Sequence, residues 1–179
     1  AYLLKIEPGT AFFRHTPAGL PDPDTAADFY LYAVEQLAAA GYVQYEISNF
    51  AKPGYEGRHN LLYWDCQDYL GLGPAAHSCM NRHRFYWPGD TRAFLEGTAK
   101  PVPDGDCDGE EYIMLRLRLA EGLEEEQLER RFGMRLTERQ KAFWRRCQAA
   151  GYAAPGDGPL RLTPAGMIIQ NSILTELLS

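Results

Sequence analysis

The sequence predicts a fold of the α/β class, α+β over the whole chain, in which a strand–helix–strand unit precedes a helical module. Two observations predict it. Two short apolar segments of strand-like composition flank a stretch between residues 22 and 41 in which apolar side chains recur at helical spacing. Beyond residue 101 the composition turns charged and helical. Hydrophobic residues make up 45% of the 179 residues, so the chain can build a core.

The strand–helix–strand unit comes first. Tyr2–Ile6 is the first expected strand, and the turn-forming sequence EPGT ends it. Asp22 and Pro23 predict the N-cap and first position of a helix. Gly41 closes this helix, and Tyr42–Ile47 follows as the second strand. Such a unit is normally parallel, and it is too small to stand alone. We therefore expect it to be the last part of a larger parallel sheet or barrel.

The second half predicts a winged-helix-like module. Asp90 caps a short helix that ends at Gly97, and Pro101–Gly105 has the composition of a linker. Three helices, a hairpin of wing size and a final helix follow, over residues 109–119, 124–132, 137–150, 152–162 and 164–177. We accordingly divide the chain into residues 1–100 and residues 101–179.

Charge and cysteine usage exclude several function classes. The formal net charge of −6 makes the chain a poor general binder of phosphate backbones, so we expect no nucleic-acid partner. No apolar run reaches the ~18 residues of a membrane span. The four cysteines are scattered without metal-site spacing, so we expect unpaired thiols in a reduced, cytoplasmic protein. The chain starts without an initiator Met, and we expect it to be part of a longer protein.

The segment YEISNFAKPGYEGRHNLLYW, residues 45–64, is the strongest candidate for a binding site. It combines aromatic side chains with a histidine and charged residues in one turn-rich stretch. This mixture suits a site that stacks a flat apolar ligand and binds its polar edges. His59 is a candidate ligand of haem iron, because imidazole is a common axial ligand. The alternative is a structural histidine satisfied by a neighbouring carbonyl.

Six blocks carry a resemblance to a known family. In chain order they are IEPGT (6–10), LPDPD (20–24), YEISNFAKPGYEGRHNLLYW (45–64), DYLGLGPAAHS (68–78), MLRLRLAEGL (114–123) and LTPAGMIIQNSIL (162–174). Together they resemble the radical-SAM family of oxygen-independent coproporphyrinogen III oxidase-like proteins, and most closely its HemW-type haem chaperone branch. The resemblance extends over nearly the whole chain.

The resemblance implies a two-part architecture. Family members have a TIM-like radical-SAM barrel that holds a [4Fe–4S] cluster on a C-x-x-x-C-x-x-C motif and binds S-adenosylmethionine. That motif is absent here. Residues 1–100 would be the last βαβ part of the barrel with a connecting region, and residues 101–179 the C-terminal domain. The resemblance therefore implies a cluster and S-adenosylmethionine in the parent protein, and no radical chemistry by this chain alone. Whether the parent is an enzyme stays open.

The H-N-x-x-Y-W pattern is a mark of the HemW-type branch, where its histidine is implicated in haem binding. By this resemblance His59 is the iron ligand, and Asn60, Tyr63 and Trp64 of the same motif are candidate tetrapyrrole contacts. Arg58 is a candidate bidentate partner of a propionate, and an Arg–Glu scaffold pair is the alternative. Gly57 stands where family members often have Cys, so His59 is the sole ligand that we propose. A second departure is Arg116, at a position where the family commonly has Gly.

A second set of candidates surrounds the sequence GLGPAAHS. In the oxidase branch this region approaches S-adenosylmethionine, so Gly71, Gly73 and His77 are candidate cofactor contacts, together with Glu46. The alternative for His77 is support of a tight turn, and the glycines permit close backbone approach. The alternative for Glu46 is a structural hydrogen bond to Asn49 or to Arg58.

Three functions remain. The first is a protein that binds haem and passes it to haem-requiring acceptor proteins. The second is a radical-SAM oxidoreductase of porphyrin biosynthesis, which converts two propionates of coproporphyrinogen III into vinyl groups. The third, a winged-helix nucleic-acid binder, depends on basic residues near the third helix of the module. Glutamates beside that helix and the net negative charge count against it.

Overall fold

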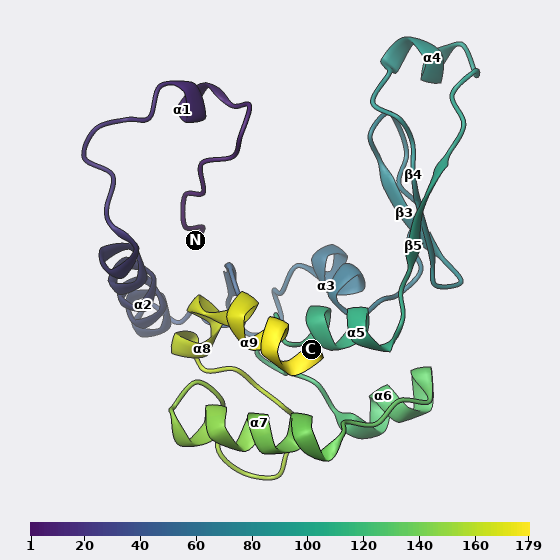
Figure 1. Ribbon diagram of the computed structural model, residues 1–179. Coiled ribbons are helices and arrows are strands. Elements are labelled where there is room, and N and C mark those ends of the chain that lie inside the picture. Colours follow the sequence, from purple (N-terminus) through teal and green to yellow (C-terminus); the bar gives the residue numbers. More distant parts are fainter.

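The computed structural model describes all residues 1–179 and has three visible parts (Figure 1). An N-terminal segment with α2 lies on one side, and an arm of three strands rises on the other. Helices α5 to α9 form the base between them. The helices are α1 (Ala11–Arg14), α2 (Pro23–Ala39), α3 (Arg58–Trp64), α4 (Thr91–Leu95), α5 (Gly109–Arg116), α6 (Glu125–Phe132), α7 (Glu138–Ala149), α8 (Pro164–Ile168) and α9 (Gln170–Leu178). The strands are β1 (Val43–Glu46), β2 (Asn49–Ala51), β3 (His77–Met80), β4 (His83–Tyr86) and β5 (Val102–Asp106).

In the N-terminal part the predicted helix is confirmed, but the predicted strand arrangement is wrong. Asp22 caps α2 by accepting a hydrogen bond from the Thr25 N–H at 2.8 Å, as Asp22-Pro23 predicts. The predicted strand Tyr2–Ile6 is wrong, because these residues have no regular secondary structure and pair with no strand. β1 instead pairs antiparallel with β2, the next segment of the chain. The parallel βαβ unit is therefore absent, although the mixed α/β class is confirmed.

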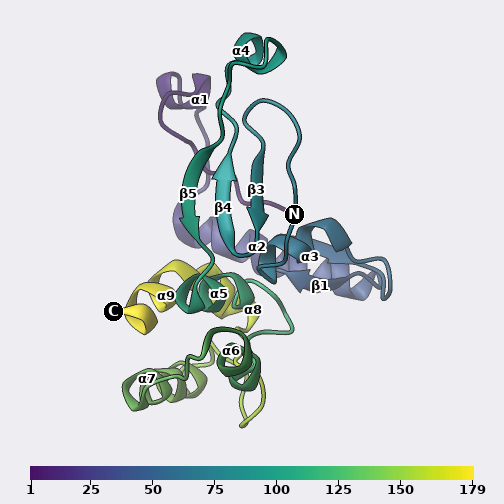
Figure 2. The same ribbon diagram turned by 90° about the vertical axis from the view of Figure 1, so that its right-hand side faces the viewer.

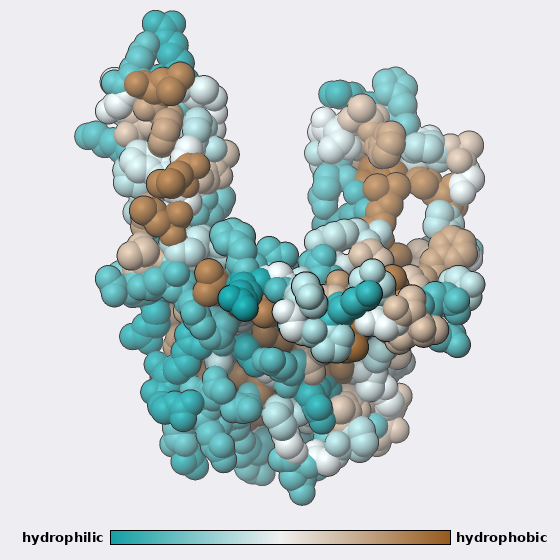
Figure 3. Space-filling model, turned by 180° about the vertical axis from the view of Figure 1, so that it is seen from behind, coloured by the Kyte–Doolittle hydropathy of each residue, from teal (hydrophilic) through white to brown (hydrophobic).

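The arm is an antiparallel sheet in the order β3–β4–β5, with α4 at its tip (Figure 2). Asp90 caps α4 as predicted. The predicted linker at residues 101–105 is wrong, because this stretch forms β5 along the outer side of β4. Pro103 lacks an N–H, yet it is tolerated because β5 is an edge strand. The arm exposes apolar side chains, among them Leu70, Leu72 and Leu95 (Figure 3).

The base confirms the winged-helix-like module. α5, α6 and α7 follow one another. The antiparallel bridge between Ala153 and Leu162 closes the wing hairpin, and a second bridge, Leu123 with Leu160, joins the hairpin to the segment between α5 and α6. Gly133 ends α6 with a left-handed φ of +65°, a conformation that favours glycine. The predicted last helix is interrupted at Ile169, which separates α8 from α9. The base holds the fully buried core residues Tyr112, Ile113, Leu117, Leu123, Leu128 and Leu177.

Two negative findings concern the whole chain. No helix is both long and apolar enough to cross a bilayer. No three side chains of the types His, Cys, Asp and Glu gather closely enough to hold a metal ion.

Candidate functional site

The HNLLYW sequence forms α3, a short helix whose first residues project into solvent. Its N-cap is Gly57, where a Cβ atom would lie 2.8 Å from the Tyr45 hydroxyl oxygen. A side chain at position 57 would therefore require Tyr45 to move. Residues four apart lie on one helix face, which places His59 beside Tyr63. The Tyr63 hydroxyl is hydrogen-bonded to His59 Nε2, and the two rings pack edge to face with centroids 4.8 Å apart.

The α3 side chains differ in exposure. Arg58 and His59 are exposed, while Asn60, Tyr63 and Trp64 are half-buried. The Arg58 side chain makes no hydrogen bond or ion pair within the protein. Tyr63 continues inward onto Tyr69, with ring centroids 4.4 Å apart. The helix thus presents an accessible imidazole backed by a row of aromatic rings.

The other face of α3 is covered by an arginine of the segment after α5. The Arg118 guanidinium lies 4.6 Å from the centroid of the Trp64 ring. Its backbone is fixed, because the Arg118 carbonyl accepts from the Ile47 N–H at 2.9 Å. Trp64 Nε1 and Arg118 Nε are both buried, and neither has a hydrogen-bond partner.

Asp65, directly after α3, anchors the helix to the base. Its carboxylate lies 3.3 Å from Arg116 Nη1 and 3.2 Å from Arg131 Nη1. Arg131 Nη2 also donates to the backbone carbonyls of Asp65, at 2.8 Å, and Cys66, at 3.1 Å. Arg116, one of the two departures from the family pattern, is only 8% exposed. The end of α3 is therefore tied to α5 and α6 by charged groups.

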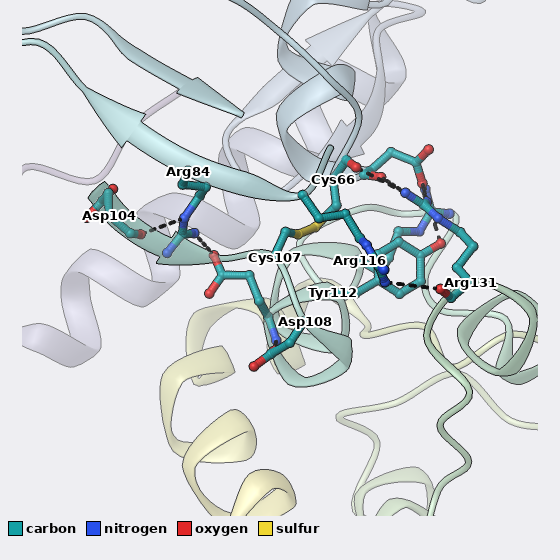
Figure 4. Close-up of a disulfide and its surroundings, with 11 residues drawn as sticks. Cys66, Arg84, Asp104, Cys107, Asp108, Tyr112, Arg116 and Arg131 are labelled. Carbon is teal, nitrogen blue, oxygen red and sulfur yellow. Dashed lines mark hydrogen bonds and ion pairs between the residues drawn. A yellow bond between two sulfur atoms is a disulfide. The ribbon is translucent and has the colours of Figure 1, made fainter. Parts of the chain in front are cut away.

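A disulfide reinforces this junction and overturns the expectation of four unpaired thiols. It joins Cys66, after α3, to Cys107, directly before the N-cap of α5 (Figure 4). The two residues are 41 positions apart, and they meet because β5 returns from the arm beside its starting point. Cys79 and Cys147 stay free and buried, and burial raises the pKa of both thiols.

The second set of candidates lies mainly on the arm. His77 opens β3, where it stacks on Tyr86 with centroids 5.2 Å apart and lies 3.4 Å from an Asp104 carboxylate oxygen. Gly71 permits a close approach, because a Cβ there would lie 2.2 Å from the His77 carbonyl oxygen. Gly73 has a φ of +111°. The glycines thus shape the turn that leads into β3.

Glu46 does not make either hydrogen bond expected for it. It is 1% exposed and accepts from the Ser48 N–H at 3.1 Å, rather than from Asn49 or Arg58. The tight turn between β1 and β2 brings that amide into reach. Glu46 therefore has the local structural role of fixing the β1–β2 turn.

The structure gathers the first set of candidates and separates it from the second. Arg58, His59, Asn60, Tyr63 and Trp64 share α3. No hydrogen bond or ring contact joins His59 to His77; they connect only through Tyr69, which touches Tyr63 and bridges to Cys79. The sequence did not identify Arg118, Asp65 or Arg131 as part of the site. Its one signal of the junction was Arg116, at a position where the family commonly has Gly.

Two groups implied by the resemblance can be compared with these residues. A [4Fe–4S] cluster needs several thiolates together. Two cysteines here form a disulfide and the other two are buried apart, so the chain does not fit a cluster. A haem needs an accessible imidazole and flat apolar contacts. His59 with Tyr63 beside it fits these requirements.

Comparisons with known proteins agree with this architecture. Residues 107–169 match the family model of the HemN C-terminal domain. The heme chaperone HemW of Escherichia coli is 38% identical over 136 residues, which cover 67% of this chain and 34% of that protein. The heme chaperone HemW of Bacillus subtilis is 29% identical over 188 residues, which cover 99% of this chain and 50% of that protein. The chain thus spans a third to a half of these relatives.

A solved structure shares the fold. The radical-SAM coproporphyrinogen III oxidase HemN from Escherichia coli superposes with a TM-score of 0.63 at 15% identity, over 90% of this chain and 43% of that one. The matched module, the HemW relatives and this fold lead to one conclusion. The chain belongs to the radical-SAM family of coproporphyrinogen III oxidase-like proteins, in its HemW-type branch.

Proposed function

We propose that this chain is the haem-contacting part of a HemW-like haem chaperone, with His59 as the iron ligand. The observation that carries the proposal is the exposed imidazole of the HNLLYW helix, with Tyr63 one turn away. In the parent protein a [4Fe–4S] cluster and S-adenosylmethionine would be bound outside these residues. Acceptor proteins that require haem would be the partners.

In this proposal four residues of α3 have separate roles. In this role Nε2 of a neutral His59 imidazole binds the iron. The bond to the metal then replaces the hydrogen bond between Nε2 and the Tyr63 hydroxyl. Until then Tyr63 orients the ring. Asn60 and the exposed Arg58 lie on the same short helix, where they can contact polar edges of the tetrapyrrole. The Asp65 junction holds the helix in place from below.

The test is a haem titration followed in the Soret band with the wild type and His59→Ala. We expect a shift that saturates near one haem per chain and is lost in the variant. His83→Ala is the matched control, because His83 is also exposed but lies on the arm beside Asp106. A shift that persists in His59→Ala, or that is lost equally in His83→Ala, would remove His59 as the ligand.

The second candidate is oxidative decarboxylation of coproporphyrinogen III by the parent protein. The superposition on HemN favours it, although this likeness concerns the fold alone. The test uses the full-length parent with a reconstituted cluster, S-adenosylmethionine and a reductant. Vinyl product would support the oxidase, whereas haem transfer without vinyl product would support the chaperone.

A further inference from the structure

Two of the three buried side-chain nitrogen or oxygen atoms without a partner belong to one stacked pair. They are Trp64 Nε1 and Arg118 Nε, and the third is Gln170 Nε2. Buried donors in proteins are nearly always paired, because an unpaired donor loses its hydration without compensation. Two such donors within one cation–π contact mark a place suited to an acceptor from outside the chain.

The charges around the end of α3 point to an anionic acceptor. Arg116 and Arg131 share the Asp65 carboxylate, and Arg116 also lies 3.4 Å from Glu121. Of the three arginines near the end of α3, Arg118 is the one without an ion pair. Three guanidinium groups therefore face two carboxylates, and the uncompensated positive charge is that of Arg118.

The Arg118 guanidinium is both accessible and preorganised. Arg118 is half-buried, and only its Nε is among the buried unpaired atoms, so its two Nη groups retain some exposure to solvent. The Trp64 ring packs against the guanidinium, whose carbon lies 4.6 Å from the ring centroid, and so restricts its position. A planar guanidinium held in this way presents two parallel N–H donors, which match the two oxygens of a carboxylate.

We infer that Arg118, backed by Trp64, is a carboxylate-binding subsite beside α3. A carboxylate can accept from the Nη groups of Arg118 beside the Trp64 ring. If the proposed function holds, on which this identification rests, the carboxylate is a propionate of the bound tetrapyrrole. Arg58, the other candidate contact to a polar edge of the tetrapyrrole, lies exposed at the start of α3, and its guanidinium has no ion pair that holds it in place.

The first test needs no haem. Glutarate is titrated into isotope-labelled protein while the three indole N–H resonances are followed by NMR, with Trp64→Phe to assign the Trp64 signal. We expect a saturable shift of the Trp64 resonance and much smaller shifts of Trp87 and Trp144. Arg118→Leu should abolish the shift, and Arg118→Gln, which keeps the stem and polarity, guards against misfolding. An unshifted Trp64 resonance in the wild type overturns the inference.

The second test compares haem with its dimethyl ester, which lacks the carboxylates. We expect the wild type to bind haem about tenfold more tightly than the ester, as for a charge-assisted hydrogen bond. Arg118→Leu should bring the two affinities together, while the control Arg92→Leu, which removes an exposed arginine at the arm tip, keeps the preference. An equal preference in wild type and Arg118→Leu contradicts the inference.

The two tests also separate this inference from the proposed function. A glutarate-induced shift without haem binding would retain the subsite and reject the haem proposal. Haem binding that requires His59 but is unaffected by esterification and by Arg118→Leu would retain the haem proposal and reject the subsite.

Discussion

A single carboxylate holds the end of α3 against the base. Asp65 accepts contacts from Arg116 and Arg131, and Tyr112 directs its hydroxyl toward the same oxygen at 3.4 Å. Both arginines are largely withdrawn from water. Removing the shared anion would leave two partly buried cations facing each other. The site is therefore more sensitive to the loss of Asp65 than to the loss of a surface charge.

We predict that Asp65→Ala lowers the free energy of unfolding by about 3 kcal/mol, the loss typical of breaking a buried ion pair. Chemical denaturation of wild type and variant measures it. Glu96→Ala is the matched control, because the Arg92–Glu96 pair at the arm tip is exposed and should contribute little. Equal losses of unfolding free energy in the two variants would show that the Asp65 junction stabilises the fold no more than an exposed ion pair does.

Ionisation of Tyr112 at alkaline pH should destabilise this junction. Burial raises the pKa of Tyr112 above its ordinary value of 10.0, Asp65 raises it further, and Arg116 and Arg131 oppose the shift. The folded protein thus holds this proton more tightly than the unfolded chain. Its stabilising effect is complete below the unfolded pKa and is lost as the pH rises through the folded pKa.

We therefore expect the free energy of unfolding to fall as the pH rises above about 10. Tyr112→Phe should reduce the slope of this fall without removing it, because burial also raises the pKa of Tyr30 and Tyr69. Denaturant titrations at several pH values measure the slopes. A variant with the wild-type slope would show that Tyr112 is not responsible.

At the scale of elements, the sequence predicted what is local and missed what depends on distant partners. The helix ends at Asp22, Asp90 and Gly133 were predictable, because capping is a contact within a few residues. Strand pairing was not: Tyr2–Ile6 finds no neighbouring strand, and residues 102–106 become β5 only because β4 lies beside them. Composition alone does not reveal such partners.

The candidate site divides in the same way. His59 and Tyr63 lie four residues apart, so helical geometry alone brings them together. Arg118 lies 54 positions beyond Trp64, and only the fold places it on that ring. The motif thus located the helix, while the groups that surround it required the structure.

The hydrogen bond along α3 makes a prediction for Tyr63. Tyr63→Phe keeps the ring but removes the hydroxyl that engages His59 Nε2. We expect tighter haem binding, by about threefold to tenfold, because the imidazole no longer has to give up a hydrogen bond of about 1 kcal/mol. Absorbance titration measures it. Weaker binding would mean that Tyr63 positions the ring productively, and Tyr55→Phe, an exposed hydroxyl outside α3, is the control.

At the scale of the whole molecule, the disulfide joins α3 to the domain that matches the HemN C-terminal model. Closing a loop of this length restricts the unfolded chain and should add about 4 kcal/mol to stability. We predict that Cys66→Ser/Cys107→Ser loses this amount, while Cys147→Ala, a buried free thiol, leaves the link intact. Thiol counting on denatured, unreduced protein should give two reactive groups; four would contradict the link.

The same link makes the arm a covalent ring. Residues 66 to 107 include β3, β4, α4 and β5, so the whole projecting sheet lies between the two bonded sulfurs. A protease that cuts once in the exposed tip would therefore release nothing. The nicked chain would run as one band on a gel without reductant and as two bands with it. An arm cleaved in this way would stay attached to the helix that carries His59.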